Sequence, residues 1–292
     1  MKFSIITPTY NRADLISILI NDVLVQSYPE WEFILVDDGS ADNTKQVVLS
    51  FQDERIKYIY QNNAERSAAR NNGIDHATGE FIVFIDSDDT IPSNFLEELH
   101  KTIKSNNYRP AIYSTRRKYK VSGEYKYTRQ LKSTDTADSI LKAGEVIFTD
   151  QCVHRSLLVK HRFKSTMEPW EDTHLFLRLL SLYPVIESNA VIHMLIHEGS
   201  TVQQGLAEVK MSNVRNYTRV VFDLLEYADL FPSEKYKPIL MDYVYKKHQM
   251  YFYQARINKQ WDIAYTILKE SMRYKFDFIY ILKSYIHVLL KS

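Results

Sequence analysis

Three carboxylates follow an apolar run in the segment FIVFIDSDD, residues 81–89. Asp86, Asp88 and Asp89 stand so close together that they would repel one another unless cations or hydroxyl groups neutralised them. An Asp-x-Asp pair can present oxygens to a hard divalent ion, Mg²⁺ or Mn²⁺, that keeps several waters and bridges to substrate phosphates. The alternative is a solvated turn in which Asp89 caps the next helix, since a short motif also arises by chance.

Alternating strand and helix patterns must position these carboxylates. Strand-length apolar runs occupy residues 3–7, 32–38, 56–61 and 81–86, and helix-like segments occupy residues 13–27, 43–52 and 65–77. This order predicts an α/β fold with a mostly parallel sheet flanked by helices. Ligands bind such sheets at the carboxyl ends of the strands, where the polar stretches TPTYNR, DDGSADN and DSDD follow the runs. The opposite edge is expected to carry nothing similar.

Composition limits the class of protein. The chain has 292 residues, of which 45% are hydrophobic and 25% charged, which suits one large domain or a domain with an appendage. Its single cysteine, Cys152, cannot form an intramolecular disulfide and is expected to be a buried apolar residue. The N-terminal apolar run is too short for a signal peptide, and no run reaches the roughly 18 residues of a membrane span. We therefore expect a cytoplasmic protein.

The order of motifs along the chain resembles the family 2 inverting glycosyltransferases of the GT-A fold. The resemblance covers about residues 2–200 and rests on SIITPTYNR, LVDDGSADNT, ERSAARNNGIDHATGEFIVFIDSDD and WEDTHLFLRLL. Each motif is weak by itself, but their fixed order is specific. The resemblance implies a GT-A catalytic domain over residues 1–205, followed by a helical C-terminal region over residues 206–292.

The resemblance implies a nucleotide-sugar site after the first three motifs. Pro8 and Tyr10 would lie against the nucleotide base, where the Tyr10 ring could stack on a pyrimidine. Asp38 would accept the imide N–H of uracil, whereas Asp37 would bond backbone or structural partners. Arg70 would reach a base or phosphate oxygen. The alternatives are a tyrosine that caps the sheet edge, ordinary turn chemistry in DDGS, and a surface ion pair for the arginine.

The same resemblance implies a different role for each aspartate in and beside the Asp-x-Asp unit. Asp86 would hold ribose hydroxyls, Asp88 would ligate a divalent metal, Mn²⁺ or Mg²⁺, and Asp89 would be structural. His197 corresponds to a histidine that binds the metal or the diphosphate in related enzymes, and His193 is the other candidate for this role. A lone histidine is more often a satisfied structural residue.

A Glu-Asp pair, Glu171 and Asp172, lies before the amphipathic helix in the segment WEDTHLFLRLL, residues 170–180. It supplies the base that the transfer still needs. By resemblance Asp172 is the base that takes the proton from the acceptor hydroxyl, so that one in-line displacement inverts the anomeric carbon. An aspartate is already ionised at neutral pH, so we expect it to need little pKa tuning. A helix N-terminal acid favoured by the macrodipole is the alternative. Trp170 would stack on the acceptor sugar or pack in the core.

Two regions stay outside these motifs. Residues 111–130 read as two strands with a basic cluster, Arg116, Arg117 and Lys118, that faces an anionic acceptor or only solvent. Residues 206–292 contain an excess of Lys and Arg over Asp and Glu, about half of the 21 tyrosines, and helical periodicity. These helices would contact an anionic membrane surface, pack on the catalytic domain, or form a homodimer.

Two other classes of protein fit the motifs less well than an active transferase does. A nucleotidyltransferase normally has a Gly-rich basic loop after its first strand, and TPTYNR contains no glycine. A non-catalytic scaffold that binds nucleotide sugars would be favoured by loss of the Glu-Asp pair, which is present here. A nucleic-acid partner is not expected, because no dense basic stripe occurs. The sequence therefore predicts transfer of a sugar, first of all from a UDP-sugar, to a saccharide or lipid-linked acceptor in surface polysaccharide or glycolipid synthesis.

Overall fold

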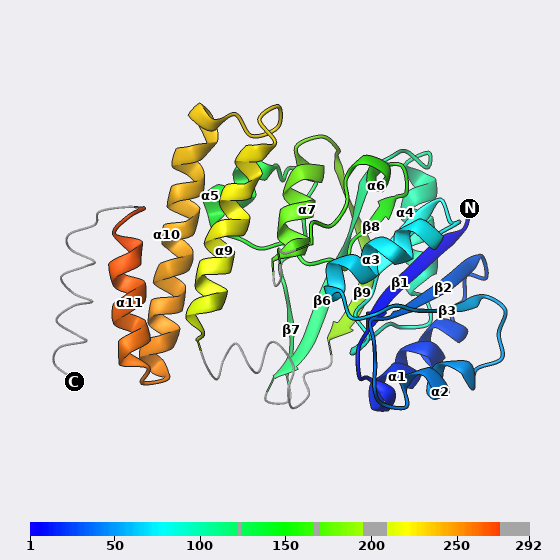
Figure 1. Cartoon of the computed structure of the whole chain (residues 1–292). Coiled ribbons are helices and arrows are strands. Elements are labelled where there is room, and N and C mark those ends of the chain that lie inside the picture. The colour runs from blue at the N-terminus through cyan, green and yellow to red at the C-terminus, as the bar shows by residue number, and fades with distance from the viewer. Residues whose placement is uncertain (122–123, 166, 168–169, 195–208, 275–292) are drawn as a thin grey trace. The chain divides into compact units, whose positions relative to one another are not determined.

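The computed structural model describes residues 1–121, 124–165, 167, 170–194 and 209–274 (Figure 1). The chain divides into two compact units, which are taken in turn. Unit 1 comprises Met1–Asp135 and Ile147–Leu195, and unit 2 comprises Thr136–Val146 and Ile196–Ser292. The sequence did not predict that residues 136–146 group with the later helices. The predicted boundary at residue 205 falls outside the described residues and stays a prediction.

The described part of unit 1 forms a nine-stranded sheet in the order β3-β2-β1-β4-β8-β6-β9-β5, with β7 paired to β6. The strands are β1 (Phe3–Thr9), β2 (Trp31–Asp37), β3 (Ile56–Tyr60), β4 (Phe81–Phe84), β5 (Asp89–Thr90), β6 (Ile112–Val121), β7 (Glu124–Tyr127), β8 (Cys152–His154) and β9 (Val185–Met194). β3, β2, β1 and β4 are all parallel, whereas β8 pairs antiparallel with β4 and β6. The predicted α/β fold with a GT-A type sheet is confirmed.

Helices cover both faces of the parallel strands because the strands bury both of their faces. The helices of unit 1 are α1 (Ala13–Leu24), α2 (Thr44–Leu49), α3 (Glu65–His76), α4 (Phe95–Ser105), α6 (Leu157–Lys160) and α7 (Glu171–Leu180). Ile16 of α1 and Phe95 of α4 pack with Ile5 of β1 in one core. The neighbouring side chain, Ile6, points to the other face, where α3 approaches so closely that a Cβ on Gly73 would lie 2.4 Å from Ile6 Cγ2.

Most predicted elements of unit 1 lie within a few residues of the observed ones. One strand outside the predicted elements is β9, which begins at Val185, where it pairs with Ile112 of β6. Cys152 is buried on β8, as predicted. Burial raises the pKa of its thiol, so this residue behaves as a small apolar side chain.

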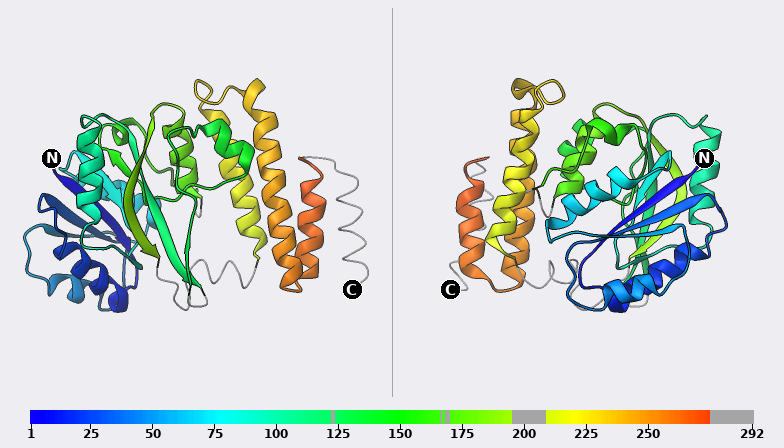
Figure 2. Two further views of the ribbon diagram at one scale, coloured as in Figure 1. Left: turned by 180° about the vertical axis from the view of Figure 1, so that it is seen from behind. Right: turned by 45° about the vertical axis from the view of Figure 1, so that its right-hand side comes forward.

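Unit 2 is helical, as the periodicity predicted. Its described elements are α5 (Ala137–Ala143), α9 (Met211–Asp223), the 3₁₀ turn η1 (Leu224–Glu226), α10 (Ser233–Ile257) and α11 (Trp261–Ser271). Figure 2 shows α9, α10 and α11 side by side. They bury a small core in which Val214, Phe252 and Ile267 take part. Among the described helices of the chain, none is both long enough and apolar enough to cross a bilayer.

Candidate active site

The polar residues predicted for the site lie at one edge of the unit 1 sheet. Tyr10 follows β1, Asp38 follows β2 and Asp86 follows β4. These three strands are parallel and adjacent, so their carboxyl ends meet. This is the edge at which open α/β sheets bind ligands.

The two aspartates after β2 make different contacts. Asp37 is buried and accepts hydrogen bonds from the Ser40 N–H (2.8 Å) and the Tyr58 hydroxyl (2.6 Å). Asp38 Oδ1 accepts from Gln61 Nε2 (2.7 Å) and from the Ala64 N–H (2.9 Å). Both oxygens of Asp37 are therefore engaged by the turn and by β3, whereas the side-chain contacts of Asp38 with described residues fall on one oxygen.

The first loop leaves an aromatic ring on the surface of this edge. Pro8 is the penultimate residue of β1 and lies beside Val36 of β2. Tyr10, two residues later, is 50% exposed. An exposed ring at the carboxyl end of a parallel sheet is available for stacking on a flat ligand.

The Asp-x-Asp unit forms a tight turn after β4. The Thr7 hydroxyl donates to the carbonyl of Ile85 (2.7 Å) and fixes the start of the turn. The Asp89 N–H donates to the Asp86 carbonyl (3.0 Å) and closes it. Asp88 lies between these two residues and is half-buried, so its position depends on how firmly Asp86 and Asp89 are held.

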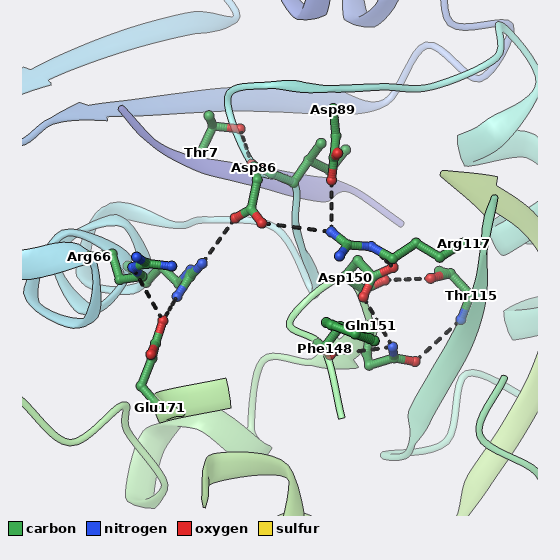
Figure 3. A network of polar contacts seen from close by, with 12 residues as sticks. Thr7, Arg66, Asp86, Asp89, Thr115, Arg117, Phe148, Asp150, Gln151 and Glu171 are labelled. Atoms are coloured by element: carbon green, nitrogen blue, oxygen red, sulfur yellow. Dashed lines mark hydrogen bonds and ion pairs between the residues drawn. The ribbon is translucent and has the colours of Figure 1, made fainter. Parts of the chain in front are cut away.

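Arg70 joins this turn to the Glu-Asp pair. Its buried guanidinium donates to Asp86 Oδ1 (2.9 Å) and to Glu171 Oε1 (2.8 Å). Glu171 Oε1 also lies 3.6 Å from Arg66 Nε (Figure 3). Burial alone would raise the pKa of Asp86, but Arg70, Arg117 and Arg66 outweigh it and lower that pKa. Asp86 is therefore held as a carboxylate, and Arg70 fixes α3 to the first turn of α7.

Arg117 of β6 holds the same turn from the other side. Its Nη2 lies 2.8 Å from Asp89 Oδ2 and 3.7 Å from Asp86 Oδ2, and its Nε lies 3.1 Å from Asp150 Oδ2 (Figure 3). Burial raises the pKa values of Asp89 and Asp150, and the charge of Arg117 opposes both shifts. The sequence placed Arg117 in a basic cluster that faces an acceptor or solvent; instead it is buried among carboxylates.

The predicted base, Asp172, lies in the first turn of α7 beside Glu171. Its Oδ1 accepts a hydrogen bond from the Thr173 N–H (2.8 Å). Burial, and after it the neighbouring charge of Glu171, raises the pKa of Asp172 to about 8. The expectation of a base with little pKa tuning was therefore wrong, because sequence alone shows neither the burial nor the uneven sharing of Arg70 between the two acids.

The predicted metal ligands are only partly described. His197 lies outside the described residues. His193 is on β9 beside Thr90, and burial lowers its pKa. Within the described ranges, no three His, Cys, Asp or Glu side chains form a group arranged to hold a metal ion. A Mg²⁺ or Mn²⁺ ion that bridges to substrate phosphates needs only one or two protein carboxylates, so Asp88 on its turn fits such an ion.

Comparison with known proteins identifies relatives of the sequence. The profile described as Glycosyl transferase family 2 matches residues 4–161. A GalNAc(5)-diNAcBac-PP-undecaprenol beta-1,3-glucosyltransferase of Campylobacter jejuni is 28% identical over 94% of this chain and 90% of its own length. The Escherichia coli enzyme WfgD, a UDP-Glc:alpha-D-GlcNAc-diphosphoundecaprenol beta-1,3-glucosyltransferase, is 45% identical over 36% of this chain and 42% of its own. The chain spans less than half the length of several other curated relatives.

Solved structures agree on the fold. Staphylococcus aureus TarS 1-349 in complex with UDP-GlcNAc has a TM-score of 0.63 at 20% identity, over 95% of this chain and 94% of that one. The mannosyltransferase PcManGT of Pyrobaculum calidifontis, in complex with GDP-Man and Mn²⁺, has a TM-score of 0.60 at 18% identity, over 100% of this chain and 81% of that one. At these identities the likeness concerns the fold alone.

Proposed function

The chain belongs to glycosyl transferase family 2, and we propose that it is a glycosyltransferase that moves a sugar from a UDP-sugar to an acceptor hydroxyl with inversion at the anomeric carbon. The observation that carries this proposal is the meeting of three parts at one sheet edge. These are the turn that bears Asp88, the Arg70 bridge, and the Asp172 carboxylate beside it.

The residues at the donor end of the site support uracil as the base of the nucleotide. Asp38 would accept the imide N–H of uracil while its Oδ1 stays bonded to the Ala64 N–H. Tyr10 is exposed one strand away and would stack on the ring. The Escherichia coli relative is named for UDP-Glc, and TarS was crystallised with UDP-GlcNAc. The sugar itself is not assigned by these residues.

We propose that Asp88, together with His197, holds a divalent ion, Mn²⁺ or Mg²⁺. When bound, such an ion would neutralise the charge that develops on the departing diphosphate. The protein contributes the turn that bears Asp88, which the hydrogen bond from the Asp89 N–H to the Asp86 carbonyl closes. Asp86, kept ionised by two buried guanidiniums, would accept hydrogen bonds from the ribose hydroxyls.

Asp172 would act as the base. In its ionised form it takes the proton of the acceptor hydroxyl while that oxygen attacks the anomeric carbon, and the bond to the nucleotide phosphate breaks on the opposite side. One displacement inverts the carbon and passes through no covalent bond between the sugar and the protein. The raised pKa of Asp172, about 8, makes its carboxylate a stronger base than an ordinary aspartate. Glu171 stays bonded to Arg70 and positions the helix turn.

We propose that the acceptor is lipid-linked and that unit 2 contacts an anionic membrane. The Campylobacter jejuni and Escherichia coli relatives are named for undecaprenol-linked acceptors. On α10, Met250, Tyr253 and Ile257 are exposed and share one helix face. The guanidinium of Arg256 lies 5.1 Å from the centre of the Tyr253 ring. Basic and aromatic side chains of this kind suit the headgroup region of a bilayer.

Vesicle flotation tests the membrane contact. The protein should float with phosphatidylglycerol vesicles and not with phosphatidylcholine vesicles, and Tyr253→Ser with Ile257→Ser should reduce flotation. If the wild-type protein does not float, and light scattering gives a dimer that these substitutions dissociate, the face binds a second copy of the chain.

Calorimetric titration of UDP into the purified protein tests the donor site. We expect binding in the presence of Mn²⁺, loss of binding in EDTA, and loss in Asp88→Ala, with the fold of the variant checked by circular dichroism. Binding of GDP or dTDP in place of UDP would refute uridine but keep the donor site. Lack of binding of all three nucleotides would refute the proposed donor site.

A further inference from the structure

Arg117 has a place in the site that its position in the sequence does not suggest. It lies on β6, outside the motifs that the sequence assigns to the site, and its residue surface is only 6% exposed. Each of its ion pairs described here is with an aspartate of unit 1: Asp86, Asp89 or Asp150. We infer that Arg117 is a positioning residue that fixes the turn bearing Asp88, and so sets the metal and nucleotide affinity of the proposed donor site.

The geometry of the turn supports this inference. Asp86 and Asp89 are the first and last residues of the turn, and a single nitrogen of Arg117 lies between their carboxylates, 3.7 Å from one and 2.8 Å from the other. Asp88 lies on the segment between them. Because the guanidinium joins both ends, it limits the freedom of the residue in the middle.

Arg117 is itself held rigidly. Asp150 lies 3.1 Å from its Nε, and the Phe148 ring centre lies 4.9 Å from its guanidinium carbon. The carbonyl of Asp150 in turn accepts a hydrogen bond from the Thr115 hydroxyl (2.5 Å), two residues before Arg117 on the same strand. The contacts shown in Figure 3 therefore join the arginine to the segment before β8, and join that segment to β6, the strand that carries the arginine. A residue that is fixed in this way can transmit its position to the turn.

Arg70 offers an internal contrast. It also bonds Asp86, at Oδ1, but its other partner is Glu171, next to the proposed base. Loss of Arg70 would disturb donor binding and the base together. The carboxylate partners of Arg117 belong instead to the Asp88 turn and to the segment before β8, so loss of Arg117 should act first on metal and donor affinity.

This inference rests on the proposed function, and two measurements keep the two apart. The first is hydrogen–deuterium exchange of the backbone over residues 85–91, which needs no ligand. The second is calorimetric binding of UDP with Mn²⁺. Both are made on the wild-type chain of residues 1–292, on Arg117→Gln and on Arg117→Lys. Arg116→Gln is the matched control, because Arg116 is the exposed neighbour whose guanidinium contacts only Gln130 among the hydrogen bonds described.

We expect Arg117→Gln to exchange faster over residues 85–91 and to bind UDP with Mn²⁺ about 10- to 100-fold more weakly, the usual cost of losing a group that orients a metal ligand. Arg117→Lys should recover part of the affinity, because it keeps the charge but not the planar fork. Arg116→Gln should match the wild type in both measurements. The KM for the acceptor should change less than the KM for the donor.

The two measurements distinguish failure of the Arg117 inference from failure of the proposed donor site. Wild-type exchange and wild-type UDP affinity in a folded Arg117→Gln or Arg117→Lys protein would overturn the inference. If Arg117→Gln does not fold, the double variant with Asp150→Asn removes one of the buried charges left without a partner, and it is subject to the same criteria. If the wild-type protein binds no nucleotide, the proposed donor site fails, and the exchange measurement alone decides whether Arg117 fixes the turn.

Discussion

The two edges of the unit 1 sheet both bury carboxylates, but with opposite balances of charge. At the amino ends of the strands, Glu32 is buried and surrounded by donors: Lys2, Ser4, Lys57, Thr78 and the Gly79 N–H. Burial would raise the pKa of Glu32, but these hydrogen bonds outweigh it and hold that pKa well below its usual range. At this edge a single buried acid, Glu32, is surrounded by a surplus of hydrogen-bond donors.

The carboxyl edge has more acids than guanidiniums. Arg70 and Arg117 are the buried cations described there, and between them they contact four carboxylates, of Asp86, Asp89, Asp150 and Glu171. Asp172 adds a further acid whose pKa is raised. A surplus of buried acids costs stability in the absence of a cation. The amino edge, where donors surround Glu32, therefore stabilises the fold. The carboxyl edge, with its surplus of buried acids, is suited to a ligand that brings positive charge.

The largest expected effect is on the reaction itself. Asp172→Asn keeps the shape of the side chain but removes the base, so we expect kcat to fall by about 10²- to 10⁴-fold. Affinity for UDP with Mn²⁺ should stay within about threefold of the wild type, because the proposed base acts on the acceptor hydroxyl. Initial rates and calorimetry measure the two quantities.

The control for this change is Asp75→Asn, at an exposed aspartate of α3 that pairs with Arg162 at 2.9 Å. It should leave kcat unchanged, because a surface ion pair contributes little. An Asp172→Asn protein with wild-type kcat would remove Asp172 from the mechanism and with it the main functional difference between the two edges.

The opposite edge gives the next effect, on stability. Glu32→Gln removes the charge that organises five neighbouring donors, and we expect about 2 kcal/mol of destabilisation, because hydrogen bonds to a buried charge are the strong ones. UDP affinity should not change. Thermal unfolding measures the first quantity and calorimetry the second.

Glu98→Gln is the matched substitution, since Glu98 pairs on the surface of α4 with Lys101 at 2.9 Å. It should lower the unfolding midpoint far less than Glu32→Gln does. Equal shifts in the two variants would mean that the Glu32 cluster has no special part in the fold.

The polar cluster at the carboxyl edge can be predicted from the sequence, whereas the Glu32 cluster at the amino edge cannot. The residues after β1, β2 and β4 form short polar stretches that can be recognised in the sequence alone. The partners of Glu32, such as Lys2 and Thr78, lie far from it in the chain, and each is an ordinary surface residue by type. The expectation that this edge carries nothing similar was therefore wrong. Clusters that form only through strand order leave no local pattern.

Arg117 and Asp172 show the same limit within the site. Arg117 stands between two other basic residues, which favours a solvated strand. In the fold it pairs with Ile192 of β9 and is buried against Asp89 and Asp150, which come from other segments. Asp172 could be found from the Glu-Asp motif, but not the rise of its pKa, which depends on burial and on Glu171. Motifs identify candidate groups, whereas their protonation depends on neighbours from other elements.

The pH dependence of the reaction distinguishes the structural pKa from the sequence expectation. A base must be deprotonated to act, and the ionised fraction of Asp172 falls tenfold for each pH unit below its pKa of about 8. We therefore expect kcat/KM to rise with pH up to about 8 and then level off. A profile that is flat from about pH 6 upward would instead agree with an ordinary aspartate, and the burial of Asp172 would then have no effect on its ionisation in the working enzyme.

The smallest expected effect concerns Tyr10, which tests where the nucleotide lies along the carboxyl edge. Loss of a base-stacking ring costs about 1 kcal/mol at the low end, so Tyr10→Ala should weaken UDP binding by roughly fivefold, and Tyr10→Phe should bind normally. Tyr60 is the matched control, because it ends β3 at the same edge and is 56% exposed, against 50% for Tyr10. If Tyr60→Ala weakens UDP binding and Tyr10→Ala does not, the base lies over β3, and Asp38 must be approached from that side.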